Sequence, residues 1–275
     1  MISNSEEEKL KELFNLELKS LLEKSEKNLL DFPKEAAAWI HSLKGLLQNA
    51  HLPEPAQAAD LLESVLLAPT RSEPEELLTL FNEFKKMVLL HLFEEEKSKP
   101  SNVSLKTLVQ AIKVTHQSIC TRLEIPSKLQ VSFTGLKEKT PLSFSLVVSL
   151  NTAIRSLLIN SFTHSGRNKD LSIQLRFSSS AQSSLQITYQ DNSDLRALQK
   201  LKKKAEMSHL DGPIEELLFK AELSSKNSHD LDSGRGLGLF GVRSLLNEVG
   251  ASVSAKVLSN GLSFGILLDQ SLDQN

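Results

Sequence analysis

The sequence is poor in features that would set the protein apart from ordinary globular proteins. Its single cysteine, Cys120, excludes an intramolecular disulfide framework and a structural zinc site built from cysteines. Its apolar stretches, such as SFSLVVSL, are far shorter than the roughly 18 residues that a membrane span needs. The formal net charge is only −2, so overall charge gives no reason to expect a nucleic-acid partner. We therefore expect no membrane span, no nucleic-acid partner and no scaffold built on cysteines.

The remaining composition is that of a soluble protein with room for two cores. Hydrophobic residues make up 40% and charged residues 24% of the 275 residues, which is enough for two modest domains. The first residues, MISNSEEEKLKELF, are acidic and amphipathic, whereas a signal peptide has a basic region followed by an apolar one. We therefore expect a cytoplasmic protein.

Residues 1–98 have the hydrophobic periodicity of four helices. Apolar residues recur at helical spacing over Glu6–Lys24, after Pro33, over Ala56–Leu67 and over Glu75–Glu95. Pro33 suits the first turn of its helix, and we expect Pro53 and Pro55 to break the chain before the third helix. Short connections between amphipathic helices favour an antiparallel bundle.

A polar segment, EEEKSKPSNVS at 94–104, separates this half from one with a different pattern. We place the domain boundary there, with a helical bundle over 1–98 and a second domain over 99–275. The second half alternates predicted helices with strand-like runs, and Asn260-Gly261 between the last two runs predicts a hairpin. The expected fold class is α+β, with a mainly antiparallel sheet and helices on one face.

A histidine, a lysine and a glycine share one ridge of the second predicted helix. In WIHSLKGLLQNAH, His41, Lys44 and Gly45 stand at i, i+3 and i+4. An unprotonated imidazole is a competent nucleophile near neutral pH. Either this is an ordinary helix with a partly buried histidine, or the ridge is a reactive surface.

A glycine-rich stretch, DSGRGLGLFGVRSLL, leads into the last predicted helix. Glycines allow backbone N–H groups to approach an anion, and a helix N-terminus adds partial positive charge. No strand leads directly into these glycines, and no Gly-Lys-Ser/Thr follows them, which argues against a Rossmann motif and a Walker P-loop. Glycines at a helix entrance also serve packing, so phosphate binding and packing both remain open from these residues alone.

Taken together, the motifs resemble those of CheA-type histidine kinases. IHSLKG is similar to the phosphoacceptor motif of a histidine phosphotransfer (HPt) domain, and LLINSFTHSG resembles the asparagine box of GHKL ATP-binding domains. QDNSD falls at the first glycine box, LLFKAELSS at the lid segment with Phe219, and SGRGLGLFG at the second glycine box. The resemblance implies an N-terminal antiparallel HPt-like helix bundle followed by a GHKL-type ATPase α/β sandwich.

The resemblance also implies a role for each matching residue. His41 would be the phosphoacceptor, with Glu63 on the next helix holding its Nδ1. Lys44 would offer positive charge to the phosphoryl group, and Gly45 would leave the ridge bare. In the second domain, Asn160 would hold the Mg²⁺ of Mg-ATP and Asp191 would select adenine. The full set implied for the nucleotide is Asn160, His164, Asp191, Gly234, Arg235, Gly236 and Gly238.

The chain departs from the family pattern in three places. Ser156 stands where the family has an acidic residue or a histidine, and both glycines of the first glycine box are replaced within 191–195. The mildest change is Thr163, just before His164.

Three functions stay open. The chain is a kinase that passes phosphate from ATP to His41 and on to a response-regulator aspartate, or a relay supplied by another histidine kinase, or a non-catalytic interaction module. The expected partner of the first two is a receiver domain. The family phosphorylates across a dimer, so a homodimer and phosphorylation within one chain both remain open.

Overall fold

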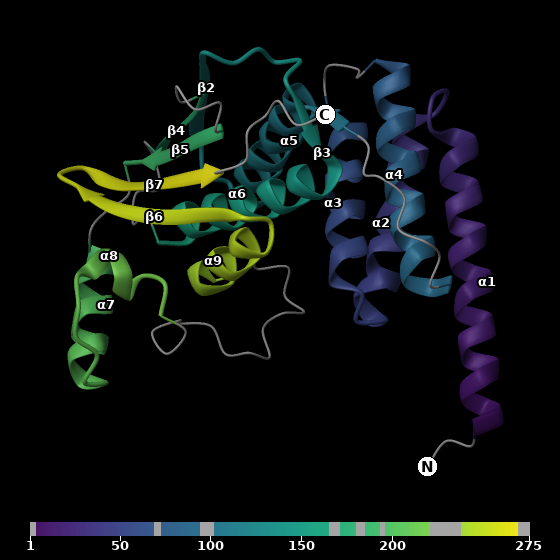
Figure 1. Cartoon of the computed structure of the whole chain (residues 1–275), viewed down its shortest axis with the longest axis horizontal. Coiled ribbons are helices and arrows are strands. Elements are labelled where there is room, and N and C mark those ends of the chain that lie inside the picture. The colour runs from purple at the N-terminus through teal and green to yellow at the C-terminus, as the bar shows by residue number, and fades with distance from the viewer. Residues whose placement is uncertain are drawn as a thin grey trace. The chain divides into compact units, whose positions relative to one another are not determined.

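The computed structural model describes residues 4–68, 73–93, 102–164, 171–179, 185–192, 196–220 and 238–268 (Figure 1). The chain forms two compact units, which are described separately. One consists of residues 1–114 with 143–148, and the other of residues 115–142 with 149–275. The domain limits 1–98 and 99–275 stay a prediction, and the first unit runs past residue 98 into the next helix.

Four consecutive helices make up most of the first unit. They are α1 (Asn4–Asn28), α2 (Pro33–Asn49), α3 (Pro53–Leu66) and α4 (Pro74–Phe93). Each helix packs on the next, and α1 also packs on α4. The side chains buried between them are mostly leucines and aromatics, among them Leu18, Leu22, Ile40, Leu43, Leu47, Leu61, Leu62, Phe81 and Phe84. The four predicted helices are therefore confirmed.

The start of the third helix differs from the expectation. Pro53 and Pro55 do not break the chain before the helix, because both lie within its first turn. The first turn of an α-helix leaves its N–H groups without intrahelical partners, so a proline there loses no hydrogen bond. Pro33 occupies the same kind of position in α2, as predicted.

A half-buried acidic side chain, Glu76, connects α4 to the segment that follows the bundle. The short strand β1 (Asn102–Ser104) leads into α5 (Leu105–Leu123). The hydroxyls of Ser104 and Thr107 both donate hydrogen bonds to Glu76 Oε1 on α4. Ser104 Oγ also accepts the Thr107 N–H at 3.3 Å and so caps α5. These contacts explain why the first half of α5 belongs to the first unit.

A five-stranded sheet forms the centre of the second unit. Its strand order is β2 (Ser127–Thr134), β4 (Leu171–Ser179), β5 (Leu185–Asp191), β7 (Gly261–Leu268) and β6 (Ala251–Leu258). Three neighbouring pairs are antiparallel, and β2 pairs with β4 in parallel. A parallel pair needs a crossover, which α6 (Phe144–His164) supplies after the short strand β3 (Pro141–Ser143). The fold is α+β with a mixed sheet.

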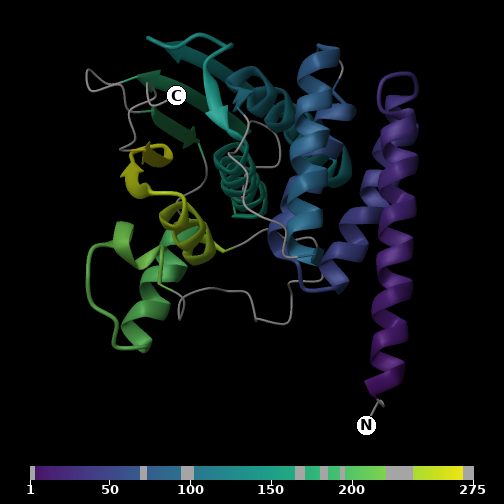
Figure 2. The same ribbon diagram turned by 45° about the vertical axis from the view of Figure 1, so that its right-hand side comes forward.

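One face of the sheet is buried and the other is exposed, as the alternating sequence predicts. Along β4 and β5 the fully buried residues are Ile173, Leu175, Phe177, Leu185, Ile187 and Tyr189, and the residues between them are polar. The remaining helices are α7 (Arg196–Met207), α8 (Ile214–Leu217) and α9 (Leu239–Glu248). Helices α8 and α9 pack on β6, and α7 packs on α8 (Figure 2).

Helix α6 is apolar enough to be considered as a membrane span. Among the described helices it alone has the length and composition to cross a membrane, over Phe144–Thr163. However, 72% of that window is buried inside the protein, which is typical of the core helix of a globular domain. A cytoplasmic location remains a prediction.

The predicted hairpin is present, and its glycine, Gly261, lies too close to the backbone of Asp191 for any side chain. Strands β6 and β7 pair from Ala251–Leu268 to Leu258–Gly261. Gly261 has φ +157°, and a Cβ placed there would lie 1.9 Å from the backbone oxygen of Asp191. Glycine therefore lets β7 begin its pairing with β5 directly beside Asp191.

We expect Gly261→Ala to destabilise the protein by about 2–4 kcal/mol, because the colliding atom is backbone and cannot rotate away. The measurement is urea unfolding followed by circular dichroism. Gly265→Ala on the same strand is the control, since its new Cβ meets only the Ser254 side-chain oxygen, at 3.2 Å. Equal stability of the two variants would contradict this account of Gly261.

Candidate functional site

His41 lies exposed on α2 with one ring nitrogen held by the neighbouring helix. Its Nδ1 is 2.9 Å from Glu63 Oε1 on α3. The His41 side chain is 67% exposed, whereas that of Glu63 is 18% exposed. A carboxylate only accepts hydrogen bonds, so in neutral imidazole the proton lies on Nδ1 and the lone pair on Nε2. This is the pairing that the resemblance implied.

Lys44 is paired with two carboxylates, whereas the resemblance implied only that it would offer its charge to a phosphoryl group. Its Nζ lies 2.5 Å from Glu63 Oε2 and 3.0 Å from Asp60 Oδ1, and its side chain is only 15% exposed. The ammonium group therefore faces two carboxylates of α3. Sequence reasoning missed Asp60, although it stands three residues before Glu63 and so on the same face of that helix.

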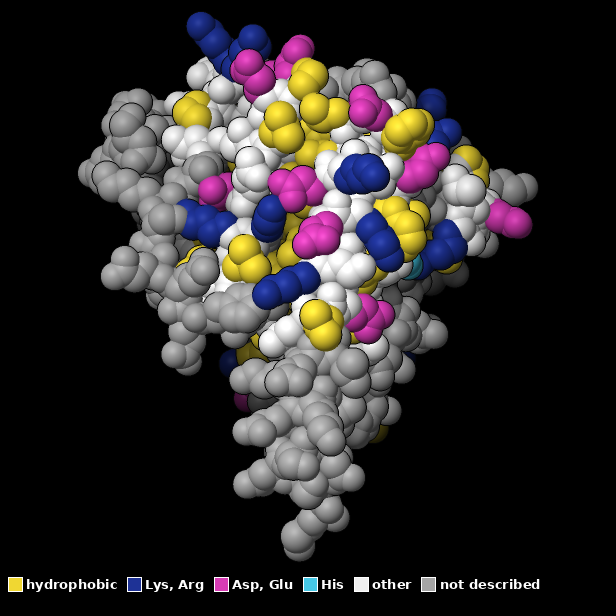
Figure 3. Space-filling model, turned by 90° about the vertical axis from the view of Figure 1, so that its right-hand side faces the viewer, with side chains coloured by type: hydrophobic (Ala, Val, Ile, Leu, Met, Phe, Trp, Pro, Cys, Tyr) yellow, Lys and Arg dark blue, Asp and Glu magenta, His cyan; other side chains and the backbone are white. Residues whose placement is uncertain are grey.

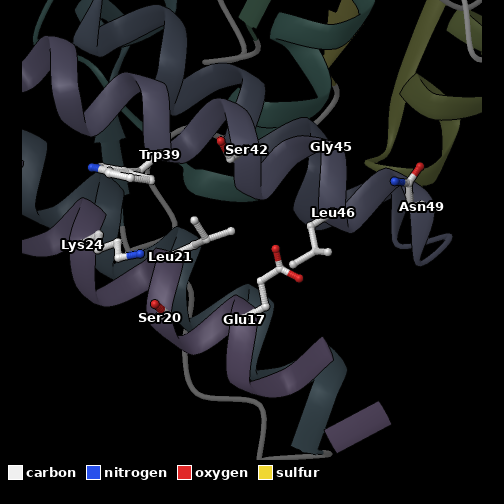
Figure 4. A pocket seen from close by; sticks show the side chains of 9 residues that line it. All are labelled: Glu17, Ser20, Leu21, Lys24, Trp39, Ser42, Gly45, Leu46 and Asn49. Carbon is white, nitrogen blue, oxygen red and sulfur yellow. The ribbon is translucent and has the colours of Figure 1, made fainter. Parts of the chain in front are cut away.

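The ridge beside His41 is open. A Cβ added at Gly45 would meet no atom within 4 Å. A pocket between α1 and α2 adjoins the ridge and includes Ser42 and Gly45 in its lining (Figure 4). Lys24 of α1 and Trp39 of α2 also line this pocket, with Lys24 Nζ 4.9 Å from the centre of the Trp39 ring. A bulky partner can therefore approach this part of α2 without a steric barrier from position 45.

Surface charge shows no segregation on the face seen in Figure 3. There the described Lys and Arg side chains are interspersed with Asp and Glu. That face therefore lacks the continuous basic patch that nucleic-acid binding requires.

The second group of candidate residues centres on Asp191, at the end of β5. Its side chain is on the buried face of the sheet and only 3% exposed. Ser161 Oγ on α6 donates a hydrogen bond to Asp191 Oδ2, and the Leu262 N–H donates to Oδ1 at 3.4 Å. Tyr189 OH lies 2.7 Å from Ser161 Oγ. A buried carboxylate is costly unless donors surround it, and these groups supply them.

The environment of Tyr189 keeps its phenol neutral. Burial raises the pKa of Tyr189 well above its ordinary value, the Asp191 charge raises it further, and the Ser161 hydrogen bond opposes the shift. A neutral phenol can donate its proton to Ser161, and Ser161 can donate its own to Asp191. The three side chains thus form one directed hydrogen-bond chain.

The other residues of the implied nucleotide site fall partly within the described chain. Asn160 is half-buried on α6. It directly precedes Ser161, the residue that contacts Asp191. Gly238 precedes α9 with φ −63°, a conformation that does not require glycine. Gly234, Arg235, Gly236 and the side chain of His164 lie outside the described residues.

Ser156, which departs from the family pattern, and Asn192, beside the replaced glycines of the first glycine box, have structural roles. Ser156 is 1% exposed, and its hydroxyl donates to the Thr152 carbonyl at 3.0 Å. Asn192, in the altered first glycine box, exchanges hydrogen bonds with the backbone of Ser172 on β4. Ser193 and the two residues after it lie outside the described residues.

Phe219 is a core residue. It is 3% exposed, with its ring centre 6.3 Å from that of Phe264. The Arg243 guanidinium lies 3.9 Å from the Phe219 ring centre. Arg243 also pairs with Glu216 at 2.9 Å and lowers the pKa of that carboxyl. Sequence reasoning did not identify Arg243, which anchors the end of α8 to α9.

No family model and no curated protein matches the sequence. Among solved structures, the chain is similar to the catalytic domain of histidine kinase ThkA, at 13% identity and a TM-score of 0.44 over 65% of this chain and 100% of that one. The histidine kinase domain of EL346 from Erythrobacter litoralis has 14% identity and a TM-score of 0.43, over 94% of this chain and 98% of that one. Full-length ShkA in complex with AMPPNP has 13% identity and a TM-score of 0.42, over 80% of this chain and 44% of that one. Likeness at this level does not assign the chain to a family.

We expect Ser161→Ala to cost about 1–3 kcal/mol of stability, because it removes one hydrogen-bond donor of a buried carboxylate and the contact of a buried phenol. Chemical unfolding followed by circular dichroism measures the loss. The control is Ser25→Ala, since Ser25 is also buried but donates only to the Leu21 carbonyl of its own helix. A loss in Ser161→Ala no larger than in Ser25→Ala would argue against the chain of hydrogen bonds.

Alkaline titration tests the environment of Tyr189 directly, because it is the only tyrosine in the protein. Its folded-state pKa is raised, so the stability it contributes is fully present below about pH 10 and lost at higher pH. Tyrosinate absorbance is therefore expected to rise only together with the loss of circular dichroism. Ionisation near pH 10 in a protein that is still folded would contradict the buried placement.

Proposed function

We propose that the protein is a CheA-like histidine kinase in which His41 accepts a phosphoryl group and passes it to an aspartate of a response-regulator receiver domain. The observation that carries the proposal is the His41–Glu63 pair, which holds Nδ1 at 2.9 Å while the ring remains 67% exposed. A histidine that is held at one nitrogen and open at the other is arranged as a nucleophile.

The residues of the first unit perform distinct parts of this reaction. Glu63 accepts a hydrogen bond from Nδ1–H, which keeps the proton on Nδ1 and the lone pair on Nε2. Nε2 attacks the phosphorus atom of the donor, a P–N bond forms, and the bond to the leaving group breaks with its electron pair. Gly45 leaves space for the donor or the receiver domain. In the second step the receiver aspartate attacks the same phosphorus, and the electron pair of the P–N bond returns to Nε2.

The second unit has residues of the right chemistry for Mg-ATP, which would supply the γ-phosphoryl group. Asn160 carries an amide oxygen, a ligand type that Mg²⁺ accepts. Asp191 would accept a hydrogen bond from the adenine amino group, since each carboxylate oxygen has more than one lone pair. Its present partners, Ser161 and Leu262, would hold it in place for that contact.

A second candidate function is a phosphate relay without its own kinase activity. Ser156 favours it, because a buried hydroxyl committed to the Thr152 carbonyl cannot serve as the base that the family has at this position. In that case another histidine kinase phosphorylates His41. A non-catalytic interaction module is the remaining alternative.

Labelling with ATP that carries a radioactive γ-phosphate separates these functions. We expect a kinase to acquire acid-labile, base-stable phosphate from ATP and Mg²⁺, and His41→Gln to abolish it. The control is His51→Asn, which removes another exposed histidine at a residue with φ +57°, a conformation that asparagine tolerates. Label that arrives only from a phosphorylated partner would establish the relay. Label from neither source, or label retained in His41→Gln, would overturn the proposal.

Calorimetric titration with AMPPNP, with and without Mg²⁺, tests the nucleotide site separately. We expect saturable binding that depends on Mg²⁺ and is weakened about tenfold or more by Asn160→Ala. Absence of binding at millimolar AMPPNP would rule out the kinase and leave the relay.

A further inference from the structure

Lys44 has a second anionic partner that the proposed reaction does not use. Its Nζ is 3.0 Å from Asp60 Oδ1, and the Asp60 side chain is only 14% exposed. Without Asp60, Lys44 would be fixed by Glu63 alone. With it, the ammonium group lies between two carboxylates of α3, and the three charges sum to −1.

We propose that Asp60 is a positioning residue that withholds Lys44 from the phosphoryl group on His41. This inference rests on the proposed function, in which His41 is the phosphoacceptor. Lys44 stands one turn after His41 on the same helix face, so its flexible side chain could otherwise reach a phosphoryl group on Nε2. The His41 side chain is 67% exposed, whereas that of Lys44 is 15% exposed and faces the carboxylates of α3.

The consequence is a phosphoryl group that is easily transferred. Phosphoryl transfer passes through a loose transition state in which the phosphoryl oxygens carry less charge than in the bound dianion. A lysine paired with those oxygens would therefore stabilise phosphohistidine more than the transition state and would prolong its lifetime. By holding Lys44 on α3, Asp60 prevents that stabilisation. Lys44 then serves to orient Glu63 through its 2.5 Å contact with Oε2.

The test uses phosphoramidate, a small phosphodonor that requires neither ATP nor a partner protein. His41 Nε2 attacks its phosphorus, the P–N bond of the reagent breaks, and ammonia leaves with the electron pair and a proton. After the reagent is removed, water attacks the phosphohistidine, inorganic phosphate is released and the electron pair returns to Nε2. Phosphorus NMR of the intact chain follows the decay, with His41→Gln as the baseline for other histidines.

We expect Asp60→Asn to lengthen the phosphohistidine lifetime about three- to tenfold, because Lys44, then paired with Glu63 alone, can also form a charge-assisted contact with the phosphoryl group. Glu35→Gln, which removes an exposed acidic side chain in the first turn of the His41 helix, is expected to change it less than about twofold, since exposed charges are screened. Asp60→Ser provides a second variant if Asp60→Asn folds poorly by circular dichroism.

A double mutant separates withholding of Lys44 from a direct effect of the Asp60 charge. Lys44→Met and Lys44→Met with Asp60→Asn are expected to have the same lifetime, because the lysine is gone in both. An unchanged lifetime in Asp60→Asn, or an increase that persists without Lys44, would overturn the inference and leave the phosphoacceptor role intact. If the wild-type chain gains no phosphate beyond His41→Gln, the proposed function fails and this inference fails with it.

Discussion

The chemistry proposed for the first unit depends on Glu63, whose two carboxylate oxygens bind two different side chains. Oε1 accepts from His41 and Oε2 from Lys44, at 2.9 and 2.5 Å. One carboxylate thus fixes the tautomer of the nucleophile and is itself fixed by a cation. Helices α2 and α3 bury small side chains, namely Ala36, Ala37, Ala56, Ala58 and Ala59. Small residues allow two helices to pack closely, which brings a residue of α3 within hydrogen-bond distance of α2.

In the second unit, too, a carboxylate is held by neighbouring side chains and backbone, but this carboxylate is buried. Asp191 is a carboxylate inside the core, where it would be costly without donors. Tyr189, Ser161 and Leu262 come from β5, α6 and β7, so the carboxylate joins three elements at one end of the sheet. Gly261 makes this junction sterically feasible by leaving room for the Asp191 backbone.

Much of this arrangement follows from local sequence patterns. Helical periodicity predicts α1–α4, alternation predicts β4 and β5, and Asn260-Gly261 predicts the last hairpin. Glu63 as the partner of Nδ1 was implied by the resemblance to the phosphotransfer motif and not by a local pattern. The prediction that Pro53 and Pro55 break the chain before α3 is wrong, because prolines disrupt a helix interior but suit a first turn.

The features that escaped prediction depend on contacts between distant segments. Asp60 becomes significant only when α3 packs on α2 and brings its carboxylate to Lys44. The Tyr189–Ser161–Asp191 chain requires the packing of α6 on β5, which no local pattern encodes. The parallel pairing of β2 with β4 is likewise set by the path of the chain between them and not by either strand sequence.

The most direct test of the central claim is a long-range ¹H–¹⁵N NMR spectrum of His41 in neutral form. If Glu63 fixes the imidazole for attack through Nε2, then Nδ1 will show the shift of a protonated nitrogen and Nε2 that of a nitrogen with a free lone pair. The difference will collapse toward the averaged shifts of a free imidazole in Glu63→Gln. A proton on Nε2 in the wild-type chain, or the same averaged shifts in both proteins, would contradict the account.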